Sequence, residues 1–126
     1  MKKLPKVLLM CAALILSGAA HNFAQTKTGG YKKIAVEDAE VVAAANFAAQ
    51  TKGAQDGAEI SVQSIENAER QTVAGANYKI CAEVFRFDDG GDVEVRQFIQ
   101  MIVFRSLKKE LTLKNWEEVE DCDAQK

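Results

Sequence analysis

The stretch that decides the fold spans residues 70–84 and reads RQTVAGANYKICAEV. From residue 77 onward, apolar residues occupy every second position, namely Tyr78, Ile80, Ala82 and Val84. Such alternation predicts a strand with one apolar face. The preceding QTVAG, residues 71–75, predicts a short turn, although it lacks the Asn, Asp or Pro that turns favour.

Further strands are predicted on both sides of this one. An alternating strand covers about 60–70, with a bulge near Ser64, and others are expected at 31–35, 93–105 and 111–120. Residues 88–92, DDGGD, form a strong hairpin-turn signal. A calcium loop is the alternative for these acids, but no spaced series of ligands follows them.

One helix is predicted at about 36–52, before the long strands. Acidic residues at 37, 38 and 40 favour a helix N-terminus, and small residues then dominate, with Phe47 as the bulky anchor. Gly53 and Gly57 are expected to end the helix. The order of elements predicts an α+β fold, with one helix packed across a four- to five-stranded antiparallel meander.

Strand direction brings three distant segments to one end of this meander. They are Gly29 and Gly30 before the first strand, QTVAG after the second, and residues 106–108 after the fourth. We call these residues the rim. Binding often resides in loops held by a rigid scaffold, and an edge of this shape would suit a groove in a partner.

The first 24 residues have the layout of a secretory signal peptide. Residues 1–6 carry three lysines, residues 7–17 are uncharged and apolar, and small residues follow at 18–20. A retained membrane anchor is the alternative, although the apolar run is short for a bilayer. Cleavage after Ala20 or Ala24 fits, and Ala24 is preferred. This leaves 25–126 as one domain, secreted or periplasmic.

Loss of residues 1–24 also restricts the chemistry. Three lysines leave, so the formal net charge moves from −2 to −5, which disfavours nucleic acid and anionic membranes as partners. Cys11 and the only histidine, His21, leave as well, which excludes Ser–His and Cys–His catalysis and the usual zinc sites. Carboxylate catalysis stays formally open, but no pair of acids is marked out. We expect no enzyme activity, metal or cofactor.

QTVAG resembles the Gln-x-Val-x-Gly loop of the cystatins, which are reversible inhibitors of papain-like cysteine proteases. Gly29-Gly30 is similar to the glycine that precedes the first strand in that family. VVAAANFA, residues 41–48, resembles the helix of its plant-type, single-domain members. The resemblance covers about residues 28–120.

The resemblance implies a tight-binding, reversible inhibitor that wedges into the protease active-site cleft without covalent reaction. The glycine lead-in would lie on the non-primed side, and the two hairpins on the primed side. Gln71 and Gly75 would hold the hairpin, and Val73 would make the central apolar contact. The implied protease-binding residues are Gly29, Gly30, Gln71, Thr72, Val73, Ala74, Gly75, Ser106 and Leu107.

The second hairpin departs from the family, which usually carries Pro-Trp there. The only proline is Pro5, and the only tryptophan is Trp116, which we assign to packing of the last strand. Leu107 is the candidate substitute. The departure supports an alternative function: a cystatin-fold binding module that inhibits no protease and uses the rim, or the sheet face with Phe85, for another protein.

The two cysteines that remain, Cys81 and Cys122, differ from the two disulfides that the resemblance associates with secreted animal members. They could pair in an oxidising compartment. However, the strands involved are about 10 Å apart, beyond the bridging limit of about 7 Å, so the tail would have to fold back under the sheet. We expect a monomer, with a domain-swapped dimer as the alternative.

Overall fold

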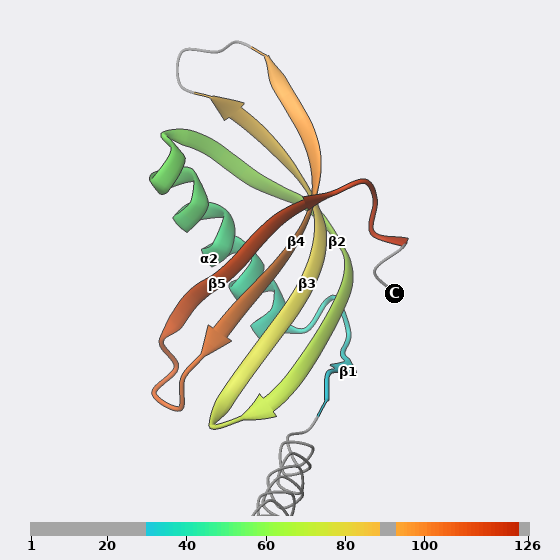
Figure 1. The fold of residues 1–126 in the computed structure, drawn as a ribbon, viewed down its shortest axis with the longest axis vertical. Coiled ribbons are helices and arrows are strands. Elements are labelled where there is room, and N and C mark those ends of the chain that lie inside the picture. Colours follow the sequence, from blue (N-terminus) through green and yellow to red (C-terminus); the bar gives the residue numbers. More distant parts are fainter. Residues whose placement is uncertain (1–29, 89–92, 124–126) are drawn as a thin grey trace, which may run out of the picture.

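Five antiparallel strands and one helix make up residues 30–88 and 93–123, the part of the chain that this computed structural model describes. The elements are β1 (Lys32–Lys33), α2 (Ala39–Asp56), β2 (Ala58–Val73), β3 (Gly75–Asp88), β4 (Glu94–Arg105) and β5 (Leu111–Val119). The strands pair in sequence order, and the helix lies across one face (Figure 1). The predicted α+β meander is confirmed. The predicted signal peptide, Gly29 and turn residues 89–92 lie outside the described residues.

Helix α2 begins at Ala39 because Asp38 caps it. The Asp38 carboxylate accepts hydrogen bonds from the backbone N–H groups of Glu40, at 2.8 Å, and Val41, at 3.4 Å. These bonds satisfy donors that have no partner within the helix. The predicted start at residue 36 was therefore three residues too early.

The helix ends at Asp56, four residues later than predicted. Gly57 terminates it in the left-handed conformation, with φ of 69°. Gly53 does not end the helix but lies inside it. A β-carbon there would meet the carbonyl oxygen of Ala58 at 2.6 Å, so this glycine lets the last helical turn approach the start of β2.

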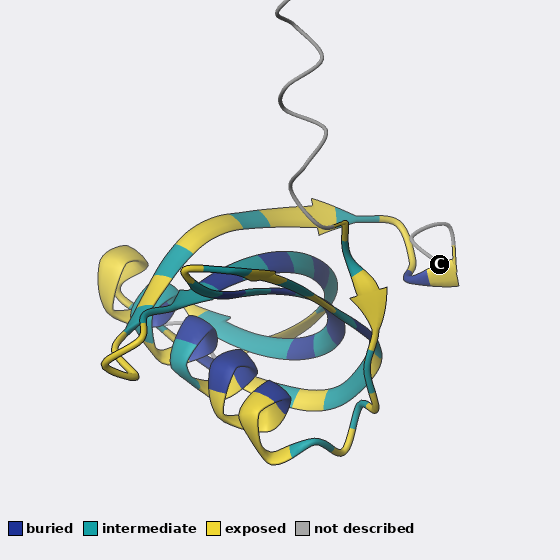
Figure 2. Cartoon of the chain, turned by 90° about the horizontal axis from the view of Figure 1, so that it is seen from below, coloured by how far each residue is buried: buried dark blue, intermediate teal, exposed yellow. Residues whose placement is uncertain are grey.

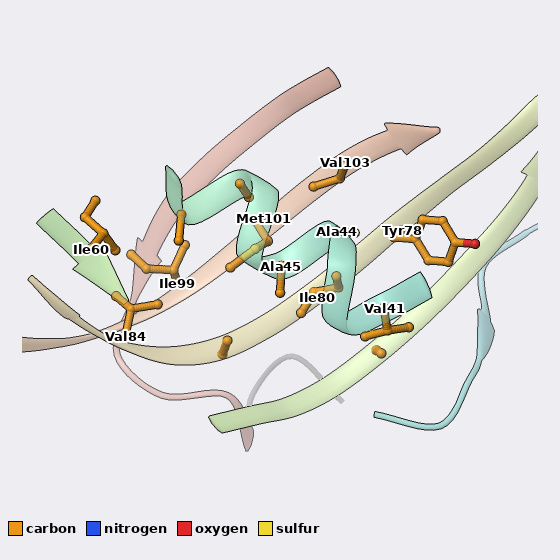
Figure 3. Close-up of a cluster of buried hydrophobic side chains, with 14 of the residues drawn as sticks. Val41, Ala44, Ala45, Ile60, Tyr78, Ile80, Val84, Ile99, Met101 and Val103 are labelled. Carbon is orange, nitrogen blue, oxygen red and sulfur yellow. The ribbon is translucent and has the colours of Figure 1, made fainter. Parts of the chain in front are cut away.

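Small residues on the helix face large residues on the sheet. The buried helical positions are Val41, Ala44, Ala45, Ala48, Ala49 and Gly53. Against them pack the largest buried sheet residues, Tyr78, Ile80, Val84, Ile99, Met101 and Val103 (Figure 3). The alternation predicted for β3 therefore gives the correct core face. Phe47, predicted as the anchor, is only half-buried.

The strands curve around the helix, as the view from the hairpin end shows (Figure 2). Strand β2 contains a register shift between Val62 and Ser64, which confirms the predicted bulge, and a second shift between Ile65 and Asn67. Strand β1 is two residues long rather than five. Within the described residues, most of β2 therefore has no strand on its outer side.

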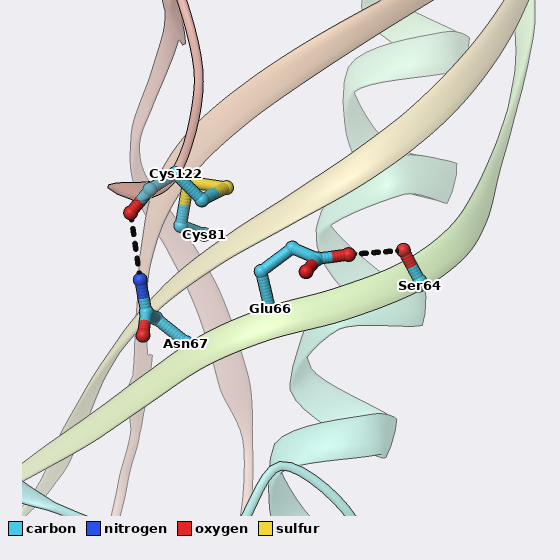
Figure 4. Close-up of a disulfide and its surroundings, with 5 residues drawn as sticks. All are labelled: Ser64, Glu66, Asn67, Cys81 and Cys122. Atoms are coloured by element: carbon cyan, nitrogen blue, oxygen red, sulfur yellow. Dashed lines mark hydrogen bonds between the residues drawn. A yellow bond between two sulfur atoms is a disulfide. The ribbon is translucent and has the colours of Figure 1, made fainter. Parts of the chain in front are cut away.

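A disulfide joins Cys81 of β3 to Cys122, with the two Cα atoms 5.7 Å apart. Cys122 lies beyond the end of β5, in a tail that turns back over the sheet face opposite the helix. There the Asn67 side-chain amide donates a hydrogen bond of 2.8 Å to the Cys122 carbonyl oxygen (Figure 4). The spacing between β3 and β5 does not prevent the disulfide, because the tail after β5 crosses that distance to reach β3.

Removal of this disulfide should destabilise the fold. The sequence separation is 41 residues, and a loop of that length corresponds to about 3–4 kcal/mol of unfolded-state entropy. We expect Cys81→Ala/Cys122→Ala to lower the free energy of unfolding by about that amount, measured by urea denaturation of residues 25–126. Reductant should reduce the stability of the parent chain but leave the variant unchanged. Equal stability of the two proteins would contradict the expectation.

Candidate functional site

The described rim segments lie at one end of the sheet. Strand β1 pairs Lys32 with Arg70, so Gly30 precedes β1 on the side where β2 ends. Ala76 pairs with Arg105, which places the β2–β3 and β4–β5 hairpins side by side at the lower end in Figure 1. The structure thus brings Gly30, QTVAG and residues 106–108 together.

The first hairpin is strand almost to its tip. Val73 pairs with Gly75, and Ala74 alone lies between β2 and β3, so the expected turn over 71–75 is much shorter than predicted. Asn77 donates a hydrogen bond of 3.0 Å from its side-chain amide to the Gln71 side-chain oxygen, across the strand pair. No role was predicted for Asn77 from the sequence, although it mirrors Gln71 three residues after the tip.

Gly75 lets the two hairpins touch. Its φ is 109°, a conformation that residues with a side chain rarely adopt. A β-carbon there would lie 2.3 Å from the Arg105 carbonyl oxygen and 3.1 Å from the Phe104 ring. The glycine therefore sets the separation of the hairpins as well as the shape of the first one.

Ser106 organises the second hairpin from within. Its hydroxyl accepts hydrogen bonds from the backbone N–H groups of Lys108, at 3.2 Å, and Glu110, at 3.0 Å. Its carbonyl accepts one from Lys109 at 2.8 Å, and Lys109 adopts a φ of 70°. The turn leaves Leu107 at its tip, where 78% of the residue is exposed.

Among the described rim residues, the large apolar side chain that is exposed is therefore that of Leu107. Val73 is half-buried, whereas its neighbours Thr72 and Ala74 are exposed. Trp116 pairs with Met101 and packs against the core, so the assignment of Trp116 to strand packing is confirmed.

A small polar cluster lies next to the first hairpin. The Lys79 ammonium sits 4.4 Å from the centre of the Tyr31 ring and 3.8 Å from a Glu69 carboxylate oxygen. Partial burial, and secondarily the nearby Glu69 carboxylate, raise the pKa of the Tyr31 hydroxyl above its ordinary value of 10.0. The cluster fixes the position of Tyr31 just after Gly30.

Within residues 30–88 and 93–123, no group of three or more His, Cys, Asp or Glu side chains could hold a metal ion. No helix in the same ranges is long and apolar enough to cross a membrane.

Three solved structures share this architecture. The salivary cystatin of the soft tick Ornithodoros moubata aligns with a TM-score of 0.61 and 17% identity, over 73% of this chain and 98% of that one. Dimeric human cystatin F aligns with a TM-score of 0.56 and 15% identity, over 73% of this chain and 87% of that one. Al-CPI aligns with a TM-score of 0.56 and 20% identity, over 72% of this chain and 100% of that one.

The chain has a cystatin-like fold. No protein-family model and no curated protein sequence matches the chain. The likeness therefore lies in the arrangement of helix and strands. In this cystatin-like fold, the helix begins at the same end of the sheet as the rim, and an ion pair of 2.9 Å between Glu40 and Arg105 connects the two.

A side chain at Gly75 should destabilise the cystatin-like fold. In Gly75→Ala, the new β-carbon would stand on a residue with positive φ and would clash with the Arg105 carbonyl oxygen. We therefore expect the free energy of unfolding, measured by urea denaturation, to fall by about 1–3 kcal/mol. Gly30→Ala is the matched control, because a β-carbon there meets nothing within 4 Å and should change stability little. Similar losses in both variants would contradict the proposed role of Gly75.

Tyr31 should make stability fall at high pH. Its pKa is raised in the folded state, so the folded form holds the proton more tightly than the unfolded form. The resulting stability is fully present below the ordinary value of 10.0 and is lost as pH rises through the folded pKa. Tyr31→Phe should therefore lose less stability than the parent between pH 9 and pH 11, measured by urea unfolding at each pH. Parallel pH curves would contradict this assignment.

Proposed function

We propose that the chain is an exported, reversible, tight-binding inhibitor of papain-like cysteine proteases rather than an enzyme. The observation that carries the proposal is the rim. Two hairpins in contact through Gly75, and a lead-in at Gly30, stand at one end of a cystatin-like fold. In the proposed complex these three segments enter the protease active-site cleft together, and no covalent bond forms.

Each rim residue has a proposed role that fits its surroundings. Gln71 and Gly75 hold the first hairpin, the former through Asn77. Val73 supplies an apolar contact, and exposed Thr72 and Ala74 are small enough to let the tip descend into the cleft. Gly29 and Gly30 lie along the non-primed side.

The second hairpin contributes a different pair of roles. The Ser106 hydroxyl forms hydrogen bonds within the turn, so the proposed role of Ser106 is to present Leu107 to the protease. Leu107 then takes the place of the large apolar contact that the family usually makes there. Because the hydrogen bonds of the turn already exist in the free protein, docking requires little further ordering of the backbone.

Export is proposed from two features. Residues 1–24 have the pattern of a signal peptide, and the Cys81–Cys122 disulfide fits the oxidising conditions of a secreted or periplasmic location. The active form would be residues 25–126, with a monomer as the proposed state and a domain-swapped dimer as the alternative.

One observation favours a second candidate function. The tip of the second hairpin carries Leu107 where the family usually has Pro-Trp, and aromatic side chains often dominate binding energy. The rim, or the sheet face with Phe85, would in that case bind a protein that is not a protease, without inhibition.

Titration of papain with residues 25–126 tests the proposed function. We expect reversible inhibition at micromolar concentration or below. Val73→Asp and Leu107→Asp should each raise the inhibition constant at least about 30-fold, because a carboxylate would be buried in the interface at a cost of about 2 kcal/mol or more.

Val93→Asp is the control for these variants. Val93 is 70% exposed, close to the 78% of Leu107, but lies at the opposite end of the sheet. It should leave the inhibition constant unchanged. Leu107→Asp keeps the test valid if Val73→Asp impairs folding, since Leu107 stands in solvent. No inhibition by the parent chain at micromolar concentration would overturn the proposal and favour the binding module.

A further inference from the structure

Charge is distributed very unevenly between one end of the described chain and the rest of it. We call residues 30–33, 70–76 and 105–110 the basic end. Its charged residues are six cations and one acid, Lys32, Lys33, Arg70, Arg105, Lys108, Lys109 and Glu110. The rest of the described chain has five cations and fifteen acids. The basic end therefore carries a formal charge of +5 and the remainder −10.

The cations at the basic end are mostly unneutralised. Arg105 pairs with Glu40 at 2.9 Å, but the other five form no ion pair with any described residue. Nearby acids are engaged elsewhere, since Glu69 pairs with Lys79 and Asp38 caps the helix.

The cations in the rest of the described chain behave differently. Four of the five form ion pairs, and Lys114 is the exception; the paired ones are Lys52, Lys79, Arg86 and Arg96. Among the described residues, unpaired positive charge is thus concentrated at the end where the hairpins project, with Lys114 as the exception elsewhere. This arrangement leaves the basic end able to attract an acidic surface.

A shallow depression between the two hairpins concentrates this charge. Its volume is about 330 Å³, and Arg70, Arg105 and Lys109 line it together with Ala76 and Tyr78. None of the described residues that line the depression is acidic. Arg and Lys donors around a small hollow of this kind suit a carboxylate.

We propose that the target protease carries acidic residues along the margins of its active-site cleft, and that one of their carboxylates enters the depression between Arg70, Arg105 and Lys109. This inference rests on the proposed function. The acidic remainder of the chain repels such a protease, so the partner is steered to the one basic end. A protease with basic cleft margins meets like charge at the rim, and this contrast gives selectivity.

Association kinetics test the inference. Residues 25–126 are assayed against a panel of papain-like proteases that range from acidic to basic cleft margins. We expect the fastest association and the lowest inhibition constants with the acidic members. For an acidic member, Lys32→Gln/Lys108→Gln should slow association at least about threefold in low salt and flatten its dependence on salt.

The matched control is Lys52→Gln/Lys114→Gln, which removes the same charge away from the basic end. It should slow association clearly less. Equal effects of the two double variants, or tighter inhibition of proteases with basic margins, would overturn the inference while leaving inhibition itself intact. Inhibition of no protease in the panel would overturn the proposed function, and this inference with it.

A titration without protease separates the two failures further. Hexaglutamate peptide is added to residues 25–126, and ¹H–¹⁵N correlation spectra are recorded. We expect the amide signals of the basic end to shift, and the shifts to disappear at high salt. Absence of shifts there, or binding of the chain to anionic phospholipid vesicles in preference to the peptide, would contradict recognition of an acidic protein surface.

Discussion

The close contact between small residues of α2 and the sheet is the constraint on which the rest of the structure depends. Alanines at 44, 45 and 48 leave room for the larger side chains of β3 and β4, and a bulkier residue there would push the helix outward. The helix begins at the end of the sheet where both hairpins turn, and the Glu40–Arg105 ion pair ties its first turn to the second hairpin. The scaffold therefore sets the relative position of the hairpins.

Irregularities in the sheet fall on its outer strands. In the described chain β1 pairs only with Glu69 and Arg70, so most of β2 forms one edge, while β5 forms the other. Both contain register shifts, two in β2 and one in β5, whereas β3 and β4 pair without any. Bulges hinder the addition of further strands to an edge. The rim, rather than the edges, is thereby left as the surface suited to a partner.

Local patterns in the sequence sufficed for the meander, the single helix and the end at which the rim lies, because alternation and strand direction determine these. These local patterns gave wrong or incomplete predictions where contacts between distant parts of the chain determine the structure. Gly53 looks like a helix stop, yet it lies inside the helix, at a place where a β-carbon would meet the Ala58 carbonyl oxygen. Cys122 reaches Cys81 through a tail that turns back over the sheet, and no periodicity encodes that path. The predicted turn at 71–75 is strand to its tip, where Val73 pairs with Gly75 and the side chains of Gln71 and Asn77 join across the strand pair.

The same limit applies to the contacts that the rim offers. The motif predicts Val73 as the central apolar contact, but Val73 is half-buried, and Leu107 is the large apolar residue that is exposed to solvent. A leucine contributes less contact area than the tryptophan that the family usually places on this hairpin. In the proposed complex, backbone contacts and the unneutralised cations around the hairpins must therefore supply more of the attraction. Because charge acts over a longer range than apolar burial, selectivity would arise largely during the approach of the partner.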